Sequence, residues 1–186
     1  NKSVVKLDTF IRDLADFSRN ARSELDHSPI DWQAMLNETL ENLQFADHAD
    51  RIQKNIQVTF EGPFYSDPVR IGIIFNNLIS NAIKYQNLKR PDSKVDITIS
   101  RVGDQARIEI KDNGIGIAKE HQAKVYNLFF RASIQSYGSG MGMYIVKNAI
   151  ERLKGHINLH SEEGEGTTFT VTLPDLGPIG LQSHPD

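Results

Sequence analysis

The 186-residue sequence predicts an α+β protein, a two-layer α/β sandwich whose helices cover one face of the sheet. Five short segments alternate apolar and polar residues, which is typical of strands with one buried and one solvated face. Three longer segments carry apolar residues at helical spacing. We therefore expect a mixed, mostly antiparallel sheet of about five strands, because a doubly wound parallel sheet would need nearly continuous apolar strands.

The amino-acid composition excludes or disfavours several classes of protein and of binding site. With 39% hydrophobic residues, the chain can bury the core of one domain and carry a smaller appendage. The net charge of −3 disfavours a broad basic surface for nucleic acid or an anionic membrane. Cysteine is absent, which excludes disulfides, thiolate metal sites and cysteine nucleophiles. Because the apolar runs are short and the start is no signal peptide, we expect a soluble, cytoplasmic fragment whose parent protein could be anchored in a membrane upstream.

Residues 1–27 predict a helix with a heptad-like stripe, which precedes a linker at 28–31. Its small and apolar residues recur in alternating steps of three and four at Val4, Leu7, Ile11, Leu14, Ser18, Ala21 and Leu25. That spacing favours the seam of a helical bundle, although packing on its own domain is the alternative. Because the heptad pattern begins only a few residues from Asn1, we expect this helix to be the second helix of a helical hairpin.

The remaining elements follow in order within a domain at 32–174. Asp31 is a candidate N-cap for a helix over 32–49, and further helices are predicted over 68–85 and 141–153. The alternating strand patterns lie at 56–60, 95–99, 106–110, 157–159 and 169–173. Residues 175–186, which are rich in glycine and proline and have no periodicity, predict a flexible tail.

The second of these helices contains the stretch FNNLISNAIKY. Its Asn77, Asn81 and Lys84 fall on one polar stripe beside the apolar one, because side chains at i, i+4 and i+7 align. Amide oxygens suit Mg²⁺, and a lysine suits phosphate. The alternative is an ordinary exposed polar face.

Asp112 ends the strand QARIEIKD on the same face as Ile108 and Ile110, where an unpaired carboxylate would be costly. The sequence DNGIGI follows, and its glycines allow the backbone to approach a flat ligand closely. A buried carboxylate that accepts hydrogen bonds suits the amine of adenine and disfavours the carbonyl of guanine. Alternatively, Asp112 forms only an Asx turn with Gly114.

Two glycine-rich segments complete the pattern. GSGMGMYIVK, from Gly138 to Lys147, runs into a helix whose N-terminus suits phosphate oxygens. It is neither a Walker A loop nor a dinucleotide fingerprint. In EGEGTTF, Gly164 and Gly166 predict a turn into the last strand, which a hairpin explains almost as well as a ligand does.

Together, NNLISNAIKY, DNGIGI, LFFR, GSGMGM and EGEGTTF resemble, in order and spacing, the catalytic and ATP-binding domain of sensor histidine kinases. This superfamily also contains the type II topoisomerase and MutL ATPases. The resemblance covers Ile30 to about Pro174 and implies the Bergerat ATP-binding fold. The helix over 1–27 resembles the second helix of the dimerisation and phosphoacceptor hairpin.

The resemblance implies roles for the polar helix. Asn77 and Asn81 correspond to the asparagines of the N box, with Asn81 favoured as the Mg²⁺ ligand and Asn77 near it. Lys84 would contact phosphate, and Tyr85 would lie against the adenine ring.

For the base, the resemblance implies that Asp112 accepts a hydrogen bond from the adenine amine. Gly114, Gly116 and Ile117 of the first glycine box would support it. Thr167 is similar to the threonine of the last box, which joins a water network there.

For the phosphates, VYNLFFR resembles the F box, in which Phe129 or Phe130 would anchor the ATP lid and Arg131 would reach the terminal phosphate. The alternative is a helix end with a surface arginine. The second glycine box, which would close the lid, supplies the candidate nucleotide-binding residues Gly138, Gly140, Met141 and Gly142. Only ASIQSY separates Arg131 from Gly138, so the lid is shorter than in many relatives.

None of the six histidines lies in the family's phosphoacceptor context. His156 and His160 fall on one predicted strand, about 13 Å apart and too far to share a metal. We interpret all six as structural or solvated, and expect the accepting histidine upstream of Asn1.

The implied chemistry is phosphoryl transfer from ATP and Mg²⁺ to a histidine on the dimerisation helix, then to an aspartate of a response-regulator receiver domain. The parent protein would be a homodimer. Two alternatives stay open: a kinase-inactive nucleotide-binding interaction module, and a mechanical ATPase or serine kinase of the same superfamily.

Overall fold

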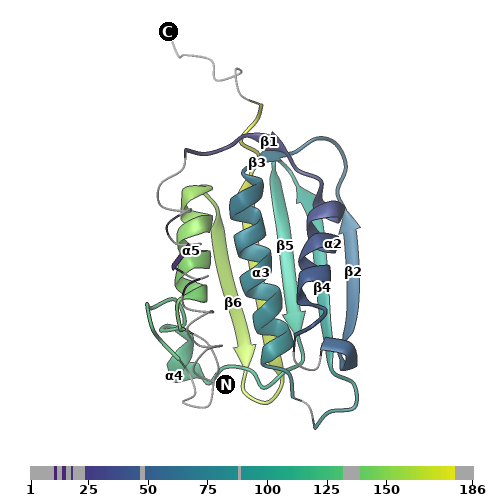
Figure 1. Cartoon of the computed structure of the whole chain (residues 1–186), viewed down its shortest axis with the longest axis vertical. Helices are drawn as coiled ribbons and strands as arrows, with labels where there is room; N and C mark the ends of the chain where they lie inside the picture. The colour runs from purple at the N-terminus through teal and green to yellow at the C-terminus, as the bar shows by residue number, and fades with distance from the viewer. Residues whose placement is uncertain are drawn as a thin grey trace.

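The computed structural model describes residues 24–46, 49–87, 89–131 and 139–178, together with Ile11, Leu14, Ala15 and Ser18. One five-stranded sheet forms the body of the molecule (Figure 1), and its strands stand in the order β2-β4-β5-β7-β6. The strands are β2 (Gln53–Thr59), β4 (Lys94–Val102), β5 (Gln105–Asp112), β6 (His156–Glu162) and β7 (Gly166–Pro174).

The sheet is mixed, as predicted. β2 pairs in parallel with β4, whereas the β4-β5, β5-β7 and β6-β7 pairs are antiparallel. Ile97, Ile110 and Phe169 lie side by side across the three central strands. All three are buried, and their contacts join the strands through one apolar face.

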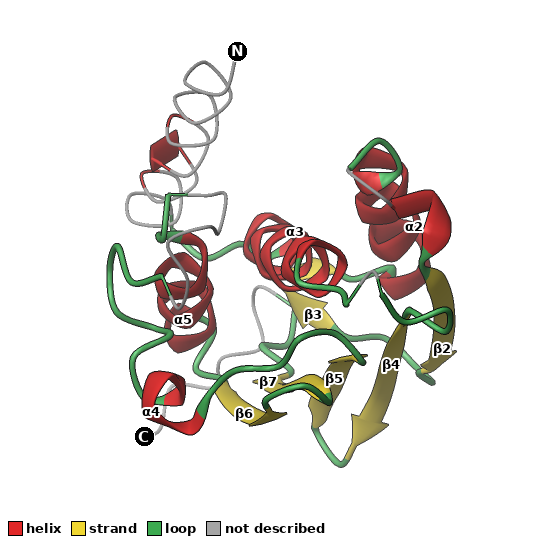
Figure 2. Cartoon of the chain, turned by 90° about the horizontal axis from the view of Figure 1, so that it is seen from below, coloured by secondary structure: helices red, strands yellow, loops and turns green. Residues whose placement is uncertain are grey.

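Three helices cover that apolar face, and the sheet and helices form two layers (Figure 2). They are α2 (Trp32–Leu43), α3 (Pro68–Lys84) and α5 (Gly142–Arg152). The central helix α3 begins where Asp67 accepts a hydrogen bond from the Arg70 amide and Pro68 occupies the first turn. Its stripe of Ile71, Ile74, Phe75, Leu78 and Ile79 is fully buried.

The predicted helix over 32–49 is too long. Asp31 caps α2 as expected, accepting a hydrogen bond from the Ala34 amide at 2.9 Å. The helix ends at Leu43, and Phe45 is 88% exposed. Continuing the helix would gain little burial, and the chain forms a turn and then a 3₁₀ turn, η1 (Ala49–Arg51).

A small two-stranded sheet was not predicted. β1 (Ser28–Pro29) in the linker pairs antiparallel with β3 (Tyr65–Ser66) just before α3. The start of the expected tail joins it, since the Leu176 amide donates to the Tyr65 carbonyl at 2.9 Å. Residues 179–186 lie outside the described residues.

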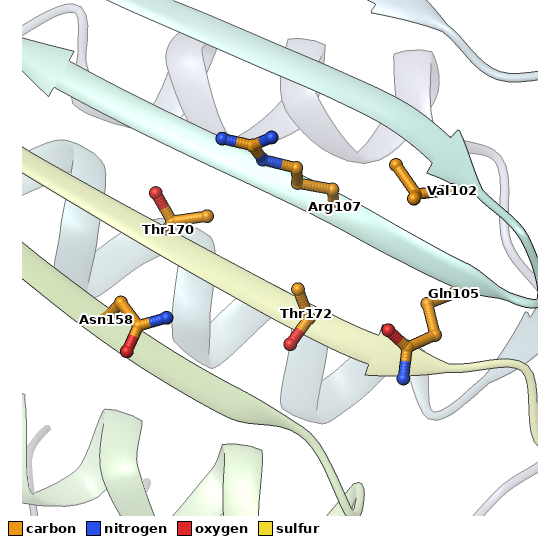
Figure 3. Close-up of a pocket in the computed structure, with 6 residues that line it drawn as sticks. All are labelled: Val102, Gln105, Arg107, Asn158, Thr170 and Thr172. Carbon is orange, nitrogen blue, oxygen red and sulfur yellow. The ribbon is translucent and has the colours of Figure 1, made fainter.

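The face of the sheet opposite the helices is polar. Six side chains line a shallow hollow there (Figure 3): Val102, Gln105, Arg107, Asn158, Thr170 and Thr172. Because α3 lies on the other face, this hollow does not include Asn77 or Asn81.

Of the N-terminal helix predicted over 1–27, the described residues Ile11, Leu14, Ala15 and Ser18 are helical, whereas residues 24–27 are not, so the predicted helix is too long at its C-terminal end. There the Asp26 amide donates to the Asp67 carboxylate and not to a helical carbonyl. Ile11 is 56% exposed and Leu14 49%. The rest of its heptad stripe, apart from Leu25, lies outside the described residues. Within the described part of the chain, no helix has the length and apolar character needed to cross a bilayer.

Candidate functional site

Most of the predicted site residues that the structure describes lie near one edge of the sandwich. The C-terminal ends of α3, β5 and β6 and the start of α5 all lie at the lower edge of Figure 1. α3 and α5 pack against each other beside this edge. Segments that are far apart in the sequence therefore supply one site.

The two asparagines of α3 are both half-buried. The Asn77 amide group donates to the Ile73 carbonyl at 2.9 Å, and the Asn81 amide group contacts the Met143 sulfur at 3.4 Å. The Asn77 Oδ1 atom lies so close to Gly142 that a β-carbon there would be 2.5 Å from it. Both amides therefore face α5, and their nitrogens are engaged there or within α3.

Lys84 and Tyr85 lie at the end of α3. The Lys84 ammonium donates to the Tyr85 hydroxyl at 3.0 Å and lies 4.6 Å from the centre of its ring. The Tyr85 carbonyl accepts from the Ile115 amide at 2.9 Å. A β-carbon on Gly114 would meet the same carbonyl at 2.3 Å, so glycine permits this junction between α3 and the first glycine box.

Asp112 is buried at the end of β5, as predicted, with 8% of its surface exposed. Its Oδ1 atom accepts from the Gly114 amide at 2.8 Å, so the Asx turn that the sequence allowed is present. Desolvation by burial raises the pKa of Asp112 to about 6, although hydrogen bonds from the Gly114 and Thr167 amides lower it. An Asx turn can form at an exposed position, so the turn alone does not explain why Asp112 is buried.

The first and last glycine boxes contact each other. Gly116 has a φ of +67°, which glycine adopts readily, and a β-carbon there would lie 2.0 Å from the Glu162 carbonyl. The Gly164 amide donates to the Ile115 carbonyl at 2.8 Å. Thr167, 7% exposed, pairs directly with Asp112 across β5 and β7.

Two polar residues that sequence reasoning missed hold these boxes together. The Ser161 hydroxyl accepts from the Ile117 amide at 2.9 Å. Gln122, at the end of the short helix α4 (Lys119–Gln122), donates to the carbonyls of Ile117 and Ser161 at 2.8 and 2.9 Å. The alternation of β6 could have indicated Ser161, because it shares the inward face with Ile157 and Leu159.

The two phenylalanines of the F box differ in environment. Phe130 is half-buried and its ring packs 5.6 Å from that of His121. Phe129 is 59% exposed with a φ of 62°, and Gly140 lies against its backbone. Arg131 is exposed.

The second glycine box is described only in part. Gly138 and the segment ASIQSY lie outside the described residues. Met141 is buried at the N-terminus of α5, and its amide donates to the Ser139 hydroxyl at 3.0 Å. Gly142 is the first residue of α5, next to Asn77.

His156 and His160 are exposed at alternate positions of β6, as expected. Within the described ranges, no three His, Cys, Asp or Glu side chains gather as a metal site would require.

Residues 66–177 match the family model described as histidine kinase-, DNA gyrase B-, and HSP90-like ATPase. The chain belongs to this family. The matched range contains α3, β5, α5 and β7, and so most of the residues brought together at the lower edge.

Curated relatives of this ATPase domain are sensor kinases. The circadian input-output histidine kinase CikA of Synechococcus elongatus is 31% identical over 174 residues, covering 89% of this chain and 23% of CikA. The sensor histidine kinase AtsR of Burkholderia thailandensis is 29% identical, covering 99% of this chain and 32% of AtsR. The chain spans a third or less of the length of these relatives, and contains the ATP-binding catalytic domain of a sensor histidine kinase.

Solved structures agree with the domain's fold. Full-length ShkA in complex with AMPPNP is 25% identical with a TM-score of 0.75, over 93% of this chain and 36% of ShkA. The catalytic domain of the histidine kinase ThkA is 22% identical, with a TM-score of 0.69. The match covers 82% of this chain and 97% of the ThkA chain. The ThkA match shows the shared α+β fold.

Proposed function

We propose that this ATPase domain binds ATP and Mg²⁺ at the lower edge of the sandwich and transfers the terminal phosphoryl group to a histidine on a dimerisation helix. A nitrogen of that histidine would attack the terminal phosphorus, and the bond to the bridging oxygen of ADP would break. The phosphoryl group would then pass to an aspartate of a response-regulator receiver domain.

The observation that carries the proposal is the placement of a buried carboxylate and two helix amides at one edge. Asp112 lies at the end of β5, while Asn77 faces the start of α5 at Gly142. A base bound at Asp112 would have its amine beside the carboxylate. Its phosphates would reach the N-terminus of α5, where backbone amides and the helix dipole favour negative charge.

The residues present fit Mg²⁺. The Asn77 nitrogen is engaged by the Ile73 carbonyl and the Asn81 nitrogen by Met143, so the amide oxygens of both side chains remain to act as ligands. Mg²⁺ takes one or two such protein oxygens beside phosphates and waters. When bound, the ion would neutralise charge on the phosphates, with Asn81 as its main protein ligand and Asn77 beside it.

The other site residues would position the nucleotide. Tyr85 would lie against the base, and Lys84, held by the Tyr85 hydroxyl, would contact phosphate. Arg131 would reach the terminal phosphate from the F box. Catalysis of phosphoryl transfer is mostly positioning and charge stabilisation, so this residue set suits it.

The accepting histidine would belong to a helical hairpin whose second helix would be the N-terminal helix of this chain. The exposed Ile11 and Leu14 are consistent with a seam that awaits a partner helix. Homodimerisation through that hairpin follows from the same proposal. Because CikA and AtsR are histidine kinases, they do not favour a mechanical ATPase or a serine kinase.

Calorimetric titration of the chain with ATP and GTP, each with and without Mg²⁺, tests the binding step. We expect ATP to bind more tightly than GTP, and Mg²⁺ to strengthen ATP binding. Asn81→Asp and Asp112→Asn should each abolish binding while the circular dichroism spectrum stays unchanged. Unchanged affinity in both variants would refute the site assignment.

The transfer step needs a second assay with radiolabelled ATP. The chain alone should incorporate no label, whereas a separately supplied histidine-bearing hairpin should become labelled in its presence. Label on the chain itself would contradict the proposal.

A further inference from the structure

Three polar residues stand in one row across the end of the sheet. Asp112 of β5 pairs with Thr167 of β7, and Thr167 pairs with Ser161 of β6. Residues directly opposite in antiparallel strands point to the same side. All three side chains therefore lie on the helix-covered side, at the edge where the proposed site lies.

The Ser161 hydroxyl has three neighbours. It accepts from the Ile117 amide at 2.9 Å, donates to the Gly166 carbonyl at 2.8 Å, and lies 2.9 Å from the Thr167 hydroxyl. A serine hydroxyl carries one proton and two lone pairs. Because an amide can only donate and a carbonyl can only accept, the serine proton goes to Gly166.

This arrangement fixes the direction of the third bond. The Ser161 oxygen has one lone pair left, so the Thr167 hydroxyl must donate its proton to Ser161. The oxygen of Thr167 then keeps only lone pairs for any other partner. Thr167 is 7% exposed, so rotating its hydroxyl proton away from Ser161 would leave a buried polar group without its hydrogen bond.

We propose that Ser161 is a positioning residue that holds the Thr167 hydroxyl as a hydrogen-bond acceptor, so that Thr167 and ionised Asp112 together select a base with an amine donor. This inference rests on the proposed ATP site. Two adjacent acceptors favour the two protons of the adenine amine, directly or through a water. A purine without the amine would bring no donor for the Thr167 hydroxyl oxygen or for the lone pairs of Asp112 that the Gly114 and Thr167 amides do not use.

Gln122 supports the same arrangement from outside the sheet. By donating to the Ser161 and Ile117 carbonyls, it holds the first glycine box against β6. The Ile117 amide therefore stays within hydrogen-bond distance of the Ser161 hydroxyl. It occupies one of the two lone pairs of that oxygen and leaves the other for Thr167.

The test compares the affinities of ATP and of purine riboside triphosphate, which lacks the amine, by calorimetry with Mg²⁺. In the unaltered chain, ATP should bind more tightly. Ser161→Ala should weaken ATP about tenfold, the order expected for one buried hydrogen bond, and leave the amine-free analogue nearly unchanged. Ser161→Thr keeps the hydroxyl and should restore the preference. Ser100→Ala, the same change elsewhere in the sheet, serves as the matched control.

A double-mutant cycle sharpens the test. Thr167→Val removes the acceptor and should reduce the preference for ATP by itself, and in that background Ser161→Ala should have no further effect on the preference. Should Ser161→Ala fail to fold, Ser161→Cys keeps most of the bulk but accepts hydrogen bonds poorly, and provides the same comparison.

The outcomes separate the two proposals. Equal weakening of both nucleotides by Ser161→Ala would mean that Ser161 is only structural, and would overturn the inference, as would an unchanged preference. If the unaltered chain binds neither nucleotide, the proposed ATP site itself is wrong.

Discussion

Asp67 and Arg70 form a buried ion pair in the first turn of α3, and the backbone of Glu24 and Asp26 completes it. Their side chains are 3% and 1% exposed. The Asp26 amide donates to the Asp67 carboxylate at 3.1 Å, and the Arg70 guanidinium contacts the Glu24 carbonyl at 3.4 Å. The segment that follows the N-terminal helix is therefore attached to the end of α3 remote from the proposed site.

Arg70→Met should destabilise the protein by about 3–5 kcal/mol, because it leaves the Asp67 charge buried without its partner. The double variant Asp67→Asn with Arg70→Met should recover part of this loss. Urea unfolding followed by circular dichroism measures both effects. Arg107→Met breaks an ion pair with Glu109 whose side chains are 50% and 34% exposed, and should cost no more than about 1 kcal/mol. Similar losses for Arg70 and Arg107 would contradict the buried-pair interpretation.

Gly142→Ala should weaken Mg²⁺-dependent ATP binding and leave most of the stability intact. The added β-carbon would lie 2.5 Å from the Asn77 Oδ1 atom and would displace the side chain. Gly72→Ala is the matched control, since a β-carbon there meets nothing within 4 Å. Alanine inside α3 should increase stability by up to about 1 kcal/mol without changing affinity. Titration of both variants with ATP and Mg²⁺ measures the two affinities. Equal affinities would mean that ATP binding does not need the Asn77 side chain at this position.

Burial of Asp112 makes stability depend on pH. Its folded pKa of about 6 lies above its unfolded value of 3.8, so between these values the folded protein holds a proton that the unfolded chain has released. Raising the pH from 4 to about 7 should therefore reduce the free energy of unfolding relative to Asp112→Asn, by at most about 3 kcal/mol, and the difference should level off above that pH. Denaturant unfolding of both proteins across this range tests it. A difference that stays constant or grows with pH would show that the carboxylate is not desolvated.

The two phenylalanines of the F box should respond differently to truncation. Phe130→Ala should lower the free energy of unfolding by about 1–2 kcal/mol, because its half-buried ring packs on His121. Phe129→Ala should change it by less than about 0.5 kcal/mol, since that side chain is 59% exposed. Thermal unfolding of the pair measures the contrast. A larger loss for Phe129→Ala would contradict the expectation that Phe130 contributes more of the packing in the F box.

Strand alternation and helical spacing predicted the five strands, the one-sided helices and the burial of Asp112, because each depends on local periodicity that tertiary packing reinforces. The end of α2 was not predictable in this way, since Leu43 is followed by no glycine or proline and the helix stops where burial stops. β1 and β3 are too short to show a period, and their pairing depends on long-range contacts. Ser161 was missed because the alternation of β6 marks it only as inward-facing. Its importance depends on Ile117, Gly166 and Thr167, which only the fold brings together.

The parallel pairing of β2 with β4 also encloses α3 in a long loop of the chain. The Asn55 and Asp96 side chains that meet across this pair are 41 positions apart, and α3 with both asparagines lies between them. Closing so long a loop is entropically costly and slow compared with forming a hairpin such as β4-β5. α3 and its two amides therefore lie within the segment whose ends this pairing joins. A ligand that binds only the folded site would therefore stabilise this long-range pairing together with the rest of the domain.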